Sequence, residues 1–309
     1  MAGPLPTMSA TALAPPRTLD CRGRALDLGP GQAHVMGVLN VTPDSFSDGG
    51  RYDTAQAAVE RASEMAGAGA AIVDVGGEST RPGAPPVGLD EELARVVPVI
   101  EALAQRLPHV LISVDTTKAA VARAALRAGA HIVNDVTGLR ETVGTAVAAA
   151  EYGAPLIVMH SLRKTGGPAP PGAYGDVVED VARSLRQSAE RAEALGVRDV
   201  VVDPGFGFGK TVQQNLRLVD RLDRLAVGGR PVLVGVSRKS TVGAVLGTAR
   251  RPAPVDERLY GSLGLAALAV VRGASIVRAH DVRATVEVLA VLRAAREAGA
   301  EADPVGAEL

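Results

Sequence analysis

The feature that most constrains the fold of this chain is a unit that recurs along it. In each copy an amphipathic helical stretch ends near a glycine, a small residue follows, and a short apolar run then stops on a polar residue. Five copies are clear, with the glycines Gly67, Gly129, Gly153, Gly196 and Gly273. Glycine at this point accepts the left-handed conformation that ends a helix. The apolar runs have few polar interruptions, which is typical of strands covered on both faces.

Three further apolar runs, at 35–39, 111–115 and 231–237, bring the expected strands to about eight. Helical patterns lie between the strands, at 53–66, 89–107, 118–127, 140–151, 176–195, 212–225, 257–272 and 282–298. Strands and helices that alternate at intervals of roughly 30 residues indicate a parallel sheet. Eight such units predict an α/β protein, a single-domain (β/α)8 TIM barrel, which usually takes about 250 residues. A doubly wound open sheet is the main alternative.

The segments outside the repeats predict a simple domain organisation. Residues 1–17 are rich in Ala, Pro and Thr and lack periodicity, so we expect a disordered leader. The stretch 18–31 alternates weakly around two glycines and predicts a short N-terminal hairpin that covers one end of the core. The barrel domain then occupies 18–298, and 299–309 is expected to be a flexible tail.

Composition excludes several classes of partner. The formal net charge of the 309 residues is −1, so the chain has no basic surplus for nucleic acid or an anionic membrane surface. Its one cysteine, Cys21, excludes an internal disulfide and fits a reducing compartment. No apolar run reaches the roughly 18 residues that cross a bilayer, and the N-terminus lacks the pattern of a secretory signal. We therefore expect a cytoplasmic protein without a nucleic-acid or membrane partner.

Polar residues recur where the expected strands end, which is where barrels carry their chemistry. They are acids and amides in the middle strands and cations in the last two: Asn40, Asp74, Asp115, Asn134 with Asp135, His160, Asp203, Ser237-Arg238-Lys239, and Arg278 with His280. This asymmetry predicts a substrate with two chemically different ends. Two alternatives stay open: a lone Asp at a strand end often caps the next helix, and Asp74 is also interpreted as a support for its neighbours.

The acids and amides suit a flat, hydrogen-bonding heterocycle. A carboxylate accepts from two N–H groups, and an amide both donates and accepts, so Asp115, Asn134 and Asp203 form the expected set. The cations suit a phosphate or pyrophosphate, and the last two βα loops are a frequent phosphate site of barrels. For Arg278 and His280 the alternative is ordinary helix capping.

Three loops contribute to the same end of the barrel. The strand that ends at Asn40 opens into a loop rich in Pro, Asp, Ser and Gly that holds Phe46, which predicts one corner of an active site. The segment DPGFGFGK at 203–210 lacks the spacing of a phosphate loop, and its glycines predict a backbone that passes close to a ligand, with a phenylalanine as a wall. The basic, Gly/Pro-rich loop 161–172 is interpreted as a lid or as disordered without ligand.

Taken in order, the motifs resemble those of a known family. MGVLNVTPDSFSDGG, DVGGESTRPGA, SVDTTK, NDVTG, DPGFGFGK, GVSRKS, ERLYGSLG and IVRAHDV are similar to motifs of the dihydropteroate synthases, the folate-pathway enzymes that sulfonamides target. The resemblance covers about His34 to Leu292. The departures are SLRKTGGPAPPG after His160, Ala279 in place of a common Val, and GSLG in place of GSLA. None of them removes a residue with an implied role.

The resemblance implies a transferase of folate biosynthesis. It would condense (7,8-dihydropterin-6-yl)methyl diphosphate with 4-aminobenzoate, release pyrophosphate and form 7,8-dihydropteroate. It implies Mg²⁺ as cofactor, the two substrates as small-molecule partners, and a homodimer, because the family is usually dimeric. The alternatives are a methyltetrahydrofolate-dependent methyltransferase on the same type of barrel and a catalytically silent pterin-binding paralogue.

The resemblance also implies a role for each matched residue. Asp115, Asn134, Asp203 and Lys239 match the residues that bind the pterin; Asn40 matches the Mg²⁺ ligand; Thr80 and Arg81 match contacts to the substrate and its diphosphate; Arg278 and His280 match the diphosphate cradle; and Pro43, Phe46, Asp48, Phe208 and Ser237 match the aminobenzoate pocket. The implied catalytic set is Asn40, Asp48, Asp115, Asp203 and Lys239.

Overall fold

The computed structural model describes residues 18–29, 31–41, 51–79, 84–162, 172–248 and 250–300. Eight parallel strands form a closed barrel: β3 (His34–Asn40), β4 (Ile72–Gly76), β5 (Leu111–Asp115), β6 (Ile132–Asp135), β7 (Leu156–Met159), β8 (Val200–Asp203), β9 (Val232–Val234) and β10 (Ala274–Ala279). The last strand, β10, pairs in parallel with the first, β3, and so closes the sheet. The predicted TIM barrel is confirmed, and the open doubly wound sheet is excluded.

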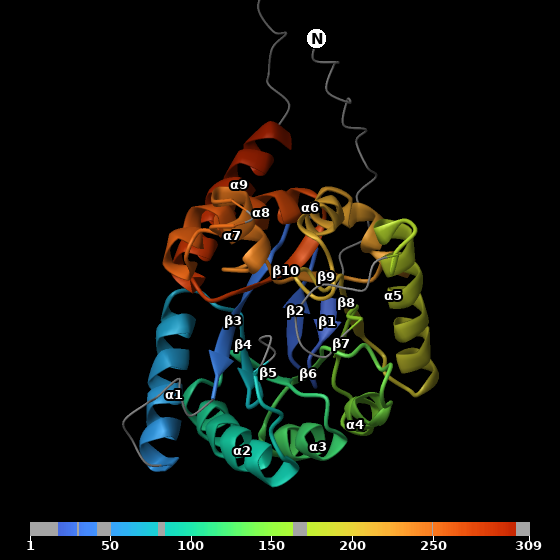
Figure 1. Ribbon diagram of the computed structural model, residues 1–309. Coiled ribbons are helices and arrows are strands. Elements are labelled where there is room, and N and C mark those ends of the chain that lie inside the picture. The colour runs from blue at the N-terminus through green and yellow to red at the C-terminus, as the bar shows by residue number, and fades with distance from the viewer. Residues whose placement is uncertain are drawn as a thin grey trace, which may run out of the picture.

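Helices surround the barrel. They are α1 (Arg51–Gly67), α2 (Leu89–Arg106), α3 (Ala119–Ala128), α4 (Gly144–Glu151), α5 (Val177–Ala194), α6 (Val212–Asp220), α7 (Ser240–Leu246), α8 (Leu259–Val271) and α9 (Val282–Ala300), with short 3₁₀ turns η2 (Leu222–Leu225), η3 (Val227–Gly229) and η4 (Val255–Arg258). Figure 1 shows the helices as a ring around the strands. Helix α9 runs two residues past the predicted end of the barrel domain at 298. The predicted leader and residues 301–309 of the predicted tail lie outside the described residues.

Two helices differ from the prediction. Helix α4 was expected from residue 140 and begins at Gly144, because the backbone is left-handed at both Gly138 and Leu139 (φ 60° and 61°) and interrupts the helical path. Helix α7 was not expected at all. It is only seven residues long and contains Gly243, so its sequence carries little helical periodicity.

An apolar layer fills the lower interior of the barrel. Its members come one from each strand: Met36, Ile72, Leu111, Ile132, Ile157, Val201, Leu233 and Ile276. The antiparallel hairpin of β1 (Thr18–Asp20) and β2 (Ala25–Asp27) packs on this layer through Leu19, Cys21, Leu26 and Leu28. In Figure 1 the hairpin strands lie at the centre of the ring of helices. The predicted hairpin therefore closes the amino-terminal end of the barrel, as expected.

The same layer explains where the site lies. Side chains two or four positions apart along a strand point to the same face. The interior above the apolar layer is therefore lined by residues two or four positions after the members of that layer. Those residues are Asn40 after Met36, Asp74 after Ile72, Asp115 after Leu111, Asn134 after Ile132, Asp203 after Val201, and Arg278 after Ile276. The barrel interior thus changes from apolar to polar towards the carboxyl ends of the strands.

Candidate active site

A compact ionic cluster occupies the centre of the barrel mouth. Arg278 Nε donates to Asp74 Oδ2 at 2.7 Å, and its Nη2 donates to Asp115 Oδ2 at 2.9 Å. Asn134 Nδ2 donates to the same Asp74 oxygen at 3.1 Å. Asp74 is fully buried. It therefore orients Arg278 and Asn134 from below, which is the supporting role that the sequence left open.

Arg278 has partners that the sequence did not predict. The sequence separated acids on the middle strands from cations on the last two, and it assigned Arg278 to a diphosphate. In the folded protein its guanidinium pairs with two carboxylates of the acidic group. The physical reason is closure of the barrel. Because β10 pairs with β3, only β3 and β4 separate the last strand from β5, and Arg278 reaches Asp115 through the barrel interior.

Asp115 has an unusual protonation equilibrium. Burial and the neighbouring Asp74 carboxylate raise the pKa of Asp115 to about 7, and Arg278 opposes them. Asn40 lies beside it. A Cβ built on Gly76, between the two strands, would lie 3.8 Å from both Asn40 Oδ1 and Asp115 Oδ2. A glycine at this position therefore leaves room for an amide oxygen and a carboxylate at the same edge of the mouth.

The loop after β8 forms a second wall. Asp203 Oδ1 accepts from the Gly205 N–H at 2.7 Å. Lys239 Nζ donates to the Phe206 carbonyl at 3.0 Å and lies 4.1 Å from the centre of the Phe208 ring. Burial lowers the pKa of Lys239 to about 8, and the Asp203 carboxylate opposes the shift. A carboxylate from the end of β8 and an aromatic face from the loop after it therefore meet an ammonium from the segment after β9.

Ser237 and His280 form a smaller pair beside β10. The Ser237 hydroxyl oxygen accepts from the His280 N–H at 3.2 Å and lies 3.1 Å from its Nδ1. Burial and the adjacent Arg278 lower the pKa of His280 to about 4. The imidazole is therefore neutral near pH 7. The Ser237 hydroxyl and Nδ1 can share one hydrogen bond, and the tautomer in which Nδ1 accepts carries its proton on Nε2, where an acceptor can reach it.

Two strand-end residues turn away from this chemistry. Arg238 donates through Nε to Asp281 at 2.8 Å and through Nη2 to its other oxygen, so its charge is already paired. The Asp135 carboxylate accepts from the Thr137 N–H and from the hydroxyls of Thr137 and Thr145. Asp135 does not cap the next helix, because the N-cap of α4 is Val143; its oxygens order the turn after β6 and bind the first turn of α4 through Thr145.

Some ordered polar residues were not singled out from the sequence. Glu92 in α2 is 1% exposed, and it accepts from the Thr116 hydroxyl at 2.6 Å and from Lys118, which also donates to Glu78 at 2.6 Å. This network joins the ends of β4 and β5. Lys210 is a second example. Lys118 and Lys210 are the last residues of the motifs SVDTTK and DPGFGFGK, and that position is a signal in the sequence.

Several predicted residues lie outside the part of the chain that the structure describes. They are Pro43, Phe46, Asp48, Thr80 and Arg81, together with most of the loop 161–172. The structure does describe His160 at the end of β7. It is 5% exposed, its N–H donates to the Asp203 carbonyl at 2.8 Å, and its Nδ1 has no hydrogen-bond partner within the described residues. Its ring lies 5.8 Å from that of Tyr174.

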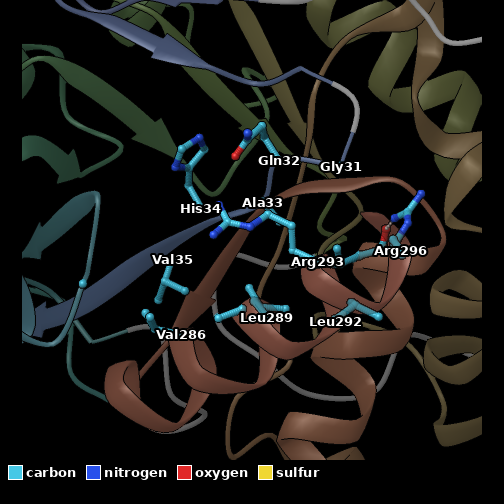
Figure 2. A pocket seen from close by; sticks show the side chains of 13 residues that line it. Gly31, Gln32, Ala33, His34, Val35, Val286, Leu289, Leu292, Arg293 and Arg296 are labelled. Carbon is cyan, nitrogen blue, oxygen red and sulfur yellow. Dashed lines mark hydrogen bonds between the residues drawn. The ribbon is translucent and has the colours of Figure 1, made fainter. Parts of the chain in front are cut away.

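A cavity at the opposite end of the barrel does not contain these residues. Its volume is about 140 Å³, and it lies between the start of β3 and helix α9. Figure 2 shows His34, Leu289 and Arg293 among its lining side chains. Barrels carry their chemistry at the carboxyl ends of the strands, so we assign the site to the polar mouth and not to this cavity.

The arrangement at the mouth has a definite chemical capacity. Asp115 and Asp203 offer acceptors to the N–H groups of a flat ring, and Asn134 lies between them along the sheet. Lys239 and the neutral His280 supply donors to an anionic group. None of the described residues forms a cluster of three or more His, Cys, Asp and Glu side chains that would hold a metal ion.

Comparison with known proteins gives one consistent result. A model of the family described as "Pterin binding enzyme" matches residues 36–280. The curated dihydropteroate synthase of Escherichia coli K12 is 48% identical over 280 residues, which cover 89% of this chain and 95% of that protein. That of Streptococcus pyogenes serotype M3 is 48% identical over 265 residues, 85% of this chain and 95% of that protein.

Solved structures agree with the sequence relatives. The dihydropteroate synthase of Xanthomonas albilineans with 4-aminobenzoic acid has a TM-score of 0.82 and 44% identity, covering 91% of this chain and 98% of that one. The Burkholderia cenocepacia enzyme complexed with 7,8-dihydropteroate has a TM-score of 0.81 and 44% identity, covering 94% and 99%. The Yersinia pestis enzyme with a sulfonamide drug complex has a TM-score of 0.81 and 44% identity, covering 91% and 100%.

Proposed function

The chain belongs to the pterin-binding enzyme family and has dihydropteroate synthase activity in folate biosynthesis, and we propose how the residues at its barrel mouth carry out that reaction. It is a transferase that joins (7,8-dihydropterin-6-yl)methyl diphosphate to 4-aminobenzoate and releases pyrophosphate. The observation that carries the residue roles is the convergence of Asp115, Asn134, Asp203 and Lys239 on one polar interior above the apolar layer. Release of pyrophosphate, measured with both substrates and with each omitted, tests the activity.

Recognition of the pterin rests on matched donors and acceptors. The ring edge presents N–H donors, and the carboxylates of Asp115 and Asp203 accept them. Asp74 holds Asn134 in place from below, so the amide is oriented before the ligand arrives. Burial of these groups strengthens each hydrogen bond and increases the free-energy cost of leaving one of the groups without a partner.

Departure of the pyrophosphate needs positive charge and donors at its oxygens. Lys239 supplies charge, and His280 supplies an N–H from Nε2 while Ser237 fixes its ring. Arg278 reaches the same interior from its pair with Asp74 and Asp115. Thr80 and Arg81 are proposed to contact the diphosphate as well. Donors fixed before the reaction stabilise the charge that develops on the leaving group.

The oxygen donors at the barrel mouth fit Mg²⁺ only in combination with the diphosphate of the substrate. Mg²⁺ binds through oxygen, keeps several waters, and is commonly held by one or two protein ligands together with substrate phosphates. Asn40 offers a side-chain oxygen at the mouth, and the described residues supply no ready-made cluster of acidic and histidine ligands. We propose that Asn40 holds Mg²⁺ together with the diphosphate. When bound, the ion neutralises charge on the pyrophosphate.

The bond changes need no strong base. The bond between the pterin methylene carbon and the diphosphate oxygen breaks, and its electron pair leaves with pyrophosphate. The lone pair of the arylamine nitrogen forms the new bond to that carbon, and the amine then loses a proton to solvent. Phe208 offers an apolar wall for the arylamine, and we propose Pro43, Phe46 and Asp48 for the same pocket. Orientation of the amine and exclusion of water favour this product over hydrolysis.

The pKa values predict a bell-shaped pH profile. Asp115 and Asp203 accept N–H bonds best when ionised, and burial raises the pKa of both carboxyl groups, that of Asp115 to about 7. The value of kcat/KM for the pterin diphosphate should therefore rise as these two groups ionise, through about pH 7. Lys239 acts as a cation, so kcat/KM should fall as the pH increases through about 8. Steady-state kinetics between pH 5.5 and 9.5 measure the rise and the fall of kcat/KM, and both reflect pKa values of the free enzyme. A flat profile over this range would contradict the two assignments.

We also propose that the protein is a homodimer. An exposed apolar surface lies over α7, η4 and α8, and it consists of Val245, Leu246, Val255, Tyr260, Leu268 and Val271. Tyr260, Leu268 and Val271 follow helical spacing and share one face of α8. Contiguous apolar surface on a folded protein marks an interaction site, and a second copy is the partner that the family resemblance implies.

Replacing Tyr260, which is 83% exposed, by aspartate should convert the dimer to a monomer. A charge in the centre of an apolar interface is left without a partner and opposes association. Sedimentation velocity at several concentrations measures the change. Val291→Asp, at an exposed residue of α9 outside this surface, is the matched control and should leave the dimer intact. A monomeric parent protein, or a dimeric Tyr260→Asp variant, would contradict the proposal.

Location and other partners stay predictions from the sequence. Within the described ranges, no helix is long and apolar enough to span a bilayer. The single cysteine, which is buried and free, fits the predicted cytoplasmic location.

A further inference from the structure

Lys210 is a buried cation that the mechanism above does not use. It is 6% exposed, at the end of the segment 203–210. Its Nζ donates to three backbone carbonyls: Gly205 at 2.9 Å, Phe208 at 2.9 Å and His160 at 3.3 Å. An ammonium has three N–H donors, whereas a neutral amine has two. The three acceptors therefore match the charged form.

These contacts tie a loop to a neighbouring strand. Gly205 and Phe208 belong to the loop after β8, and His160 ends β7. The approach is so close that a Cβ built on Gly205 would lie 1.8 Å from the His160 carbonyl oxygen, and Gly205 also has a φ of 66°. The Lys210 ammonium lies between these carbonyls as a shared donor, and the Gly205 carbonyl also accepts from the Phe208 N–H at 3.0 Å.

Asn215 fixes the other side of the same loop. It is 1% exposed, its Oδ1 accepts from the Gly207 N–H at 2.8 Å, and its Nδ2 donates to the Thr241 hydroxyl at 2.9 Å. Between these anchors, the Phe206 carbonyl points to Lys239. The path of the loop thus sets the place of the Lys239 ammonium and the Phe208 ring.

Lys210 also acts on Asp203 through charge. The charged groups that face Asp203 are Lys239, Lys210 and Arg278, and each lowers the pKa of this carboxyl against the effect of burial. Around Lys210 lie Asp203, Lys239 and Arg140. Burial lowers the pKa of Lys210 to about 7, and the Asp203 carboxylate opposes the shift, so the ammonium form prevails below about pH 7. The two groups therefore stabilise each other's charged forms.

We propose that Lys210 is a positioning residue for pterin binding: its ammonium holds the loop 203–210 on the end of β7 and keeps Asp203 ionised to accept the N–H groups of the ring. This inference rests on the proposed role of Asp203. It assigns Lys210 no contact with substrate. Its main effect reaches the pterin through Asp203.

The test is a double-mutant cycle on pterin binding. Affinity for (7,8-dihydropterin-6-yl)methyl diphosphate is measured by calorimetry between pH 5.5 and 8.5 for the parent, Lys210→Met, Asp203→Asn and the double variant. Lys210→Met should weaken binding at least about 10-fold at pH 6.5, where Lys210 is mostly charged. It should also move the acid limb, the pH range over which affinity falls on acidification, up by about one pH unit. In the Asp203→Asn variant, adding Lys210→Met should lower the affinity by less than about 3-fold, because Asp203, the residue through which Lys210 acts, is already changed.

Three further measurements separate positioning from loss of stability. Leu103→Ala in α2, a buried apolar residue away from the mouth, should lower the thermal midpoint and leave the acid limb unmoved. Lys210→Arg keeps the charge, so its acid limb should stay at the parent pH even where affinity falls. Should Lys210→Met fail to fold, Lys210→Gln takes its place in the cycle, because its amide keeps two donors without the charge.

The outcomes are distinct. The positioning role would be overturned if Lys210→Met kept the affinity and the acid limb of the parent. It would also be overturned if Lys210→Met lowered affinity by the same factor in the parent and in the Asp203→Asn variant. Asp203→Asn that binds the pterin as the parent does would instead overturn the proposed role of Asp203. A large loss in Asp203→Asn with no effect of Lys210→Met would leave the proposed function standing and remove this inference alone.

Discussion

Lys239→Ala should lower kcat/KM for the pterin diphosphate by about 100-fold and leave the fold intact. A hydrogen bond to a charged group contributes about 1.5–3 kcal/mol, and Lys239 is placed to give one to the substrate from beside Asp203 and the Phe208 ring. Among the described residues, its Nζ makes one hydrogen bond, to the Phe206 carbonyl. Loss of that bond costs about 1 kcal/mol of stability. Steady-state kinetics and thermal unfolding measure the two effects separately.

Arg238→Ala is the matched control for Lys239→Ala. It removes the same charge from the adjacent position, but Arg238 is paired with Asp281 and points away from the mouth. We expect it to change kcat/KM for the pterin diphosphate by less than about 3-fold, because its charge is already neutralised by a partner. Equal losses in both variants would show that general charge, and not the contact from Lys239, serves the substrate.

Asp203→Asn should weaken pterin binding by about 3 kcal/mol, or more than 100-fold. The replacement is nearly isosteric, and the amide oxygen can still accept from the Gly205 N–H that holds the turn. The second oxygen, however, becomes an NH₂ donor and faces the N–H of the ring. Two donors then oppose each other in a buried site, where an unsatisfied group costs about 1–3 kcal/mol or more. Calorimetry with the pterin diphosphate measures the loss.

Asp135→Asn controls for the change of a buried carboxylate as such. Asp135 also ends a barrel strand, but its oxygens accept from Thr137 and Thr145 and face away from the interior. Asp135→Asn should lower stability and leave pterin affinity within about 2-fold of the parent, since the ligand makes no contact there. If its affinity fell as far as that of Asp203→Asn, the loss would reflect a disturbed barrel and not a lost contact.

Much of the fold follows from local physical rules that are visible in the sequence. Apolar runs of strand length define the barrel strands, and their parity tells which side chains face inward. Asp74, Asn134 and Asp203 each lie two residues beyond an interior apolar residue. Their convergence could therefore be predicted without any contact information. The left-handed turn at Gly138 and Leu139 and the seven-residue helix α7 could not, because neither leaves a periodic pattern.

The partners of the charged residues were much harder to predict. The acceptors of three cations lie on elements far away in sequence or on the other side of a loop: Arg278, Lys210 and Lys118. Which acceptors they bind depends on how the closed barrel brings these elements together. Arg278 joins Asp74 across 204 positions and Asp115 across 163. The sequence placed it correctly at a strand end, but it could not show that an acidic pair would hold the guanidinium.

The most direct test of the account is a structure of the protein with (7,8-dihydropterin-6-yl)methyl diphosphate bound. We expect the pterin ring inside the barrel mouth, with its N–H groups on the carboxylates of Asp115 and Asp203 and its diphosphate towards Lys239 and His280. A ring seated elsewhere, for example in the cavity beside Arg293 at the opposite end of the barrel, would contradict the assignment of the site.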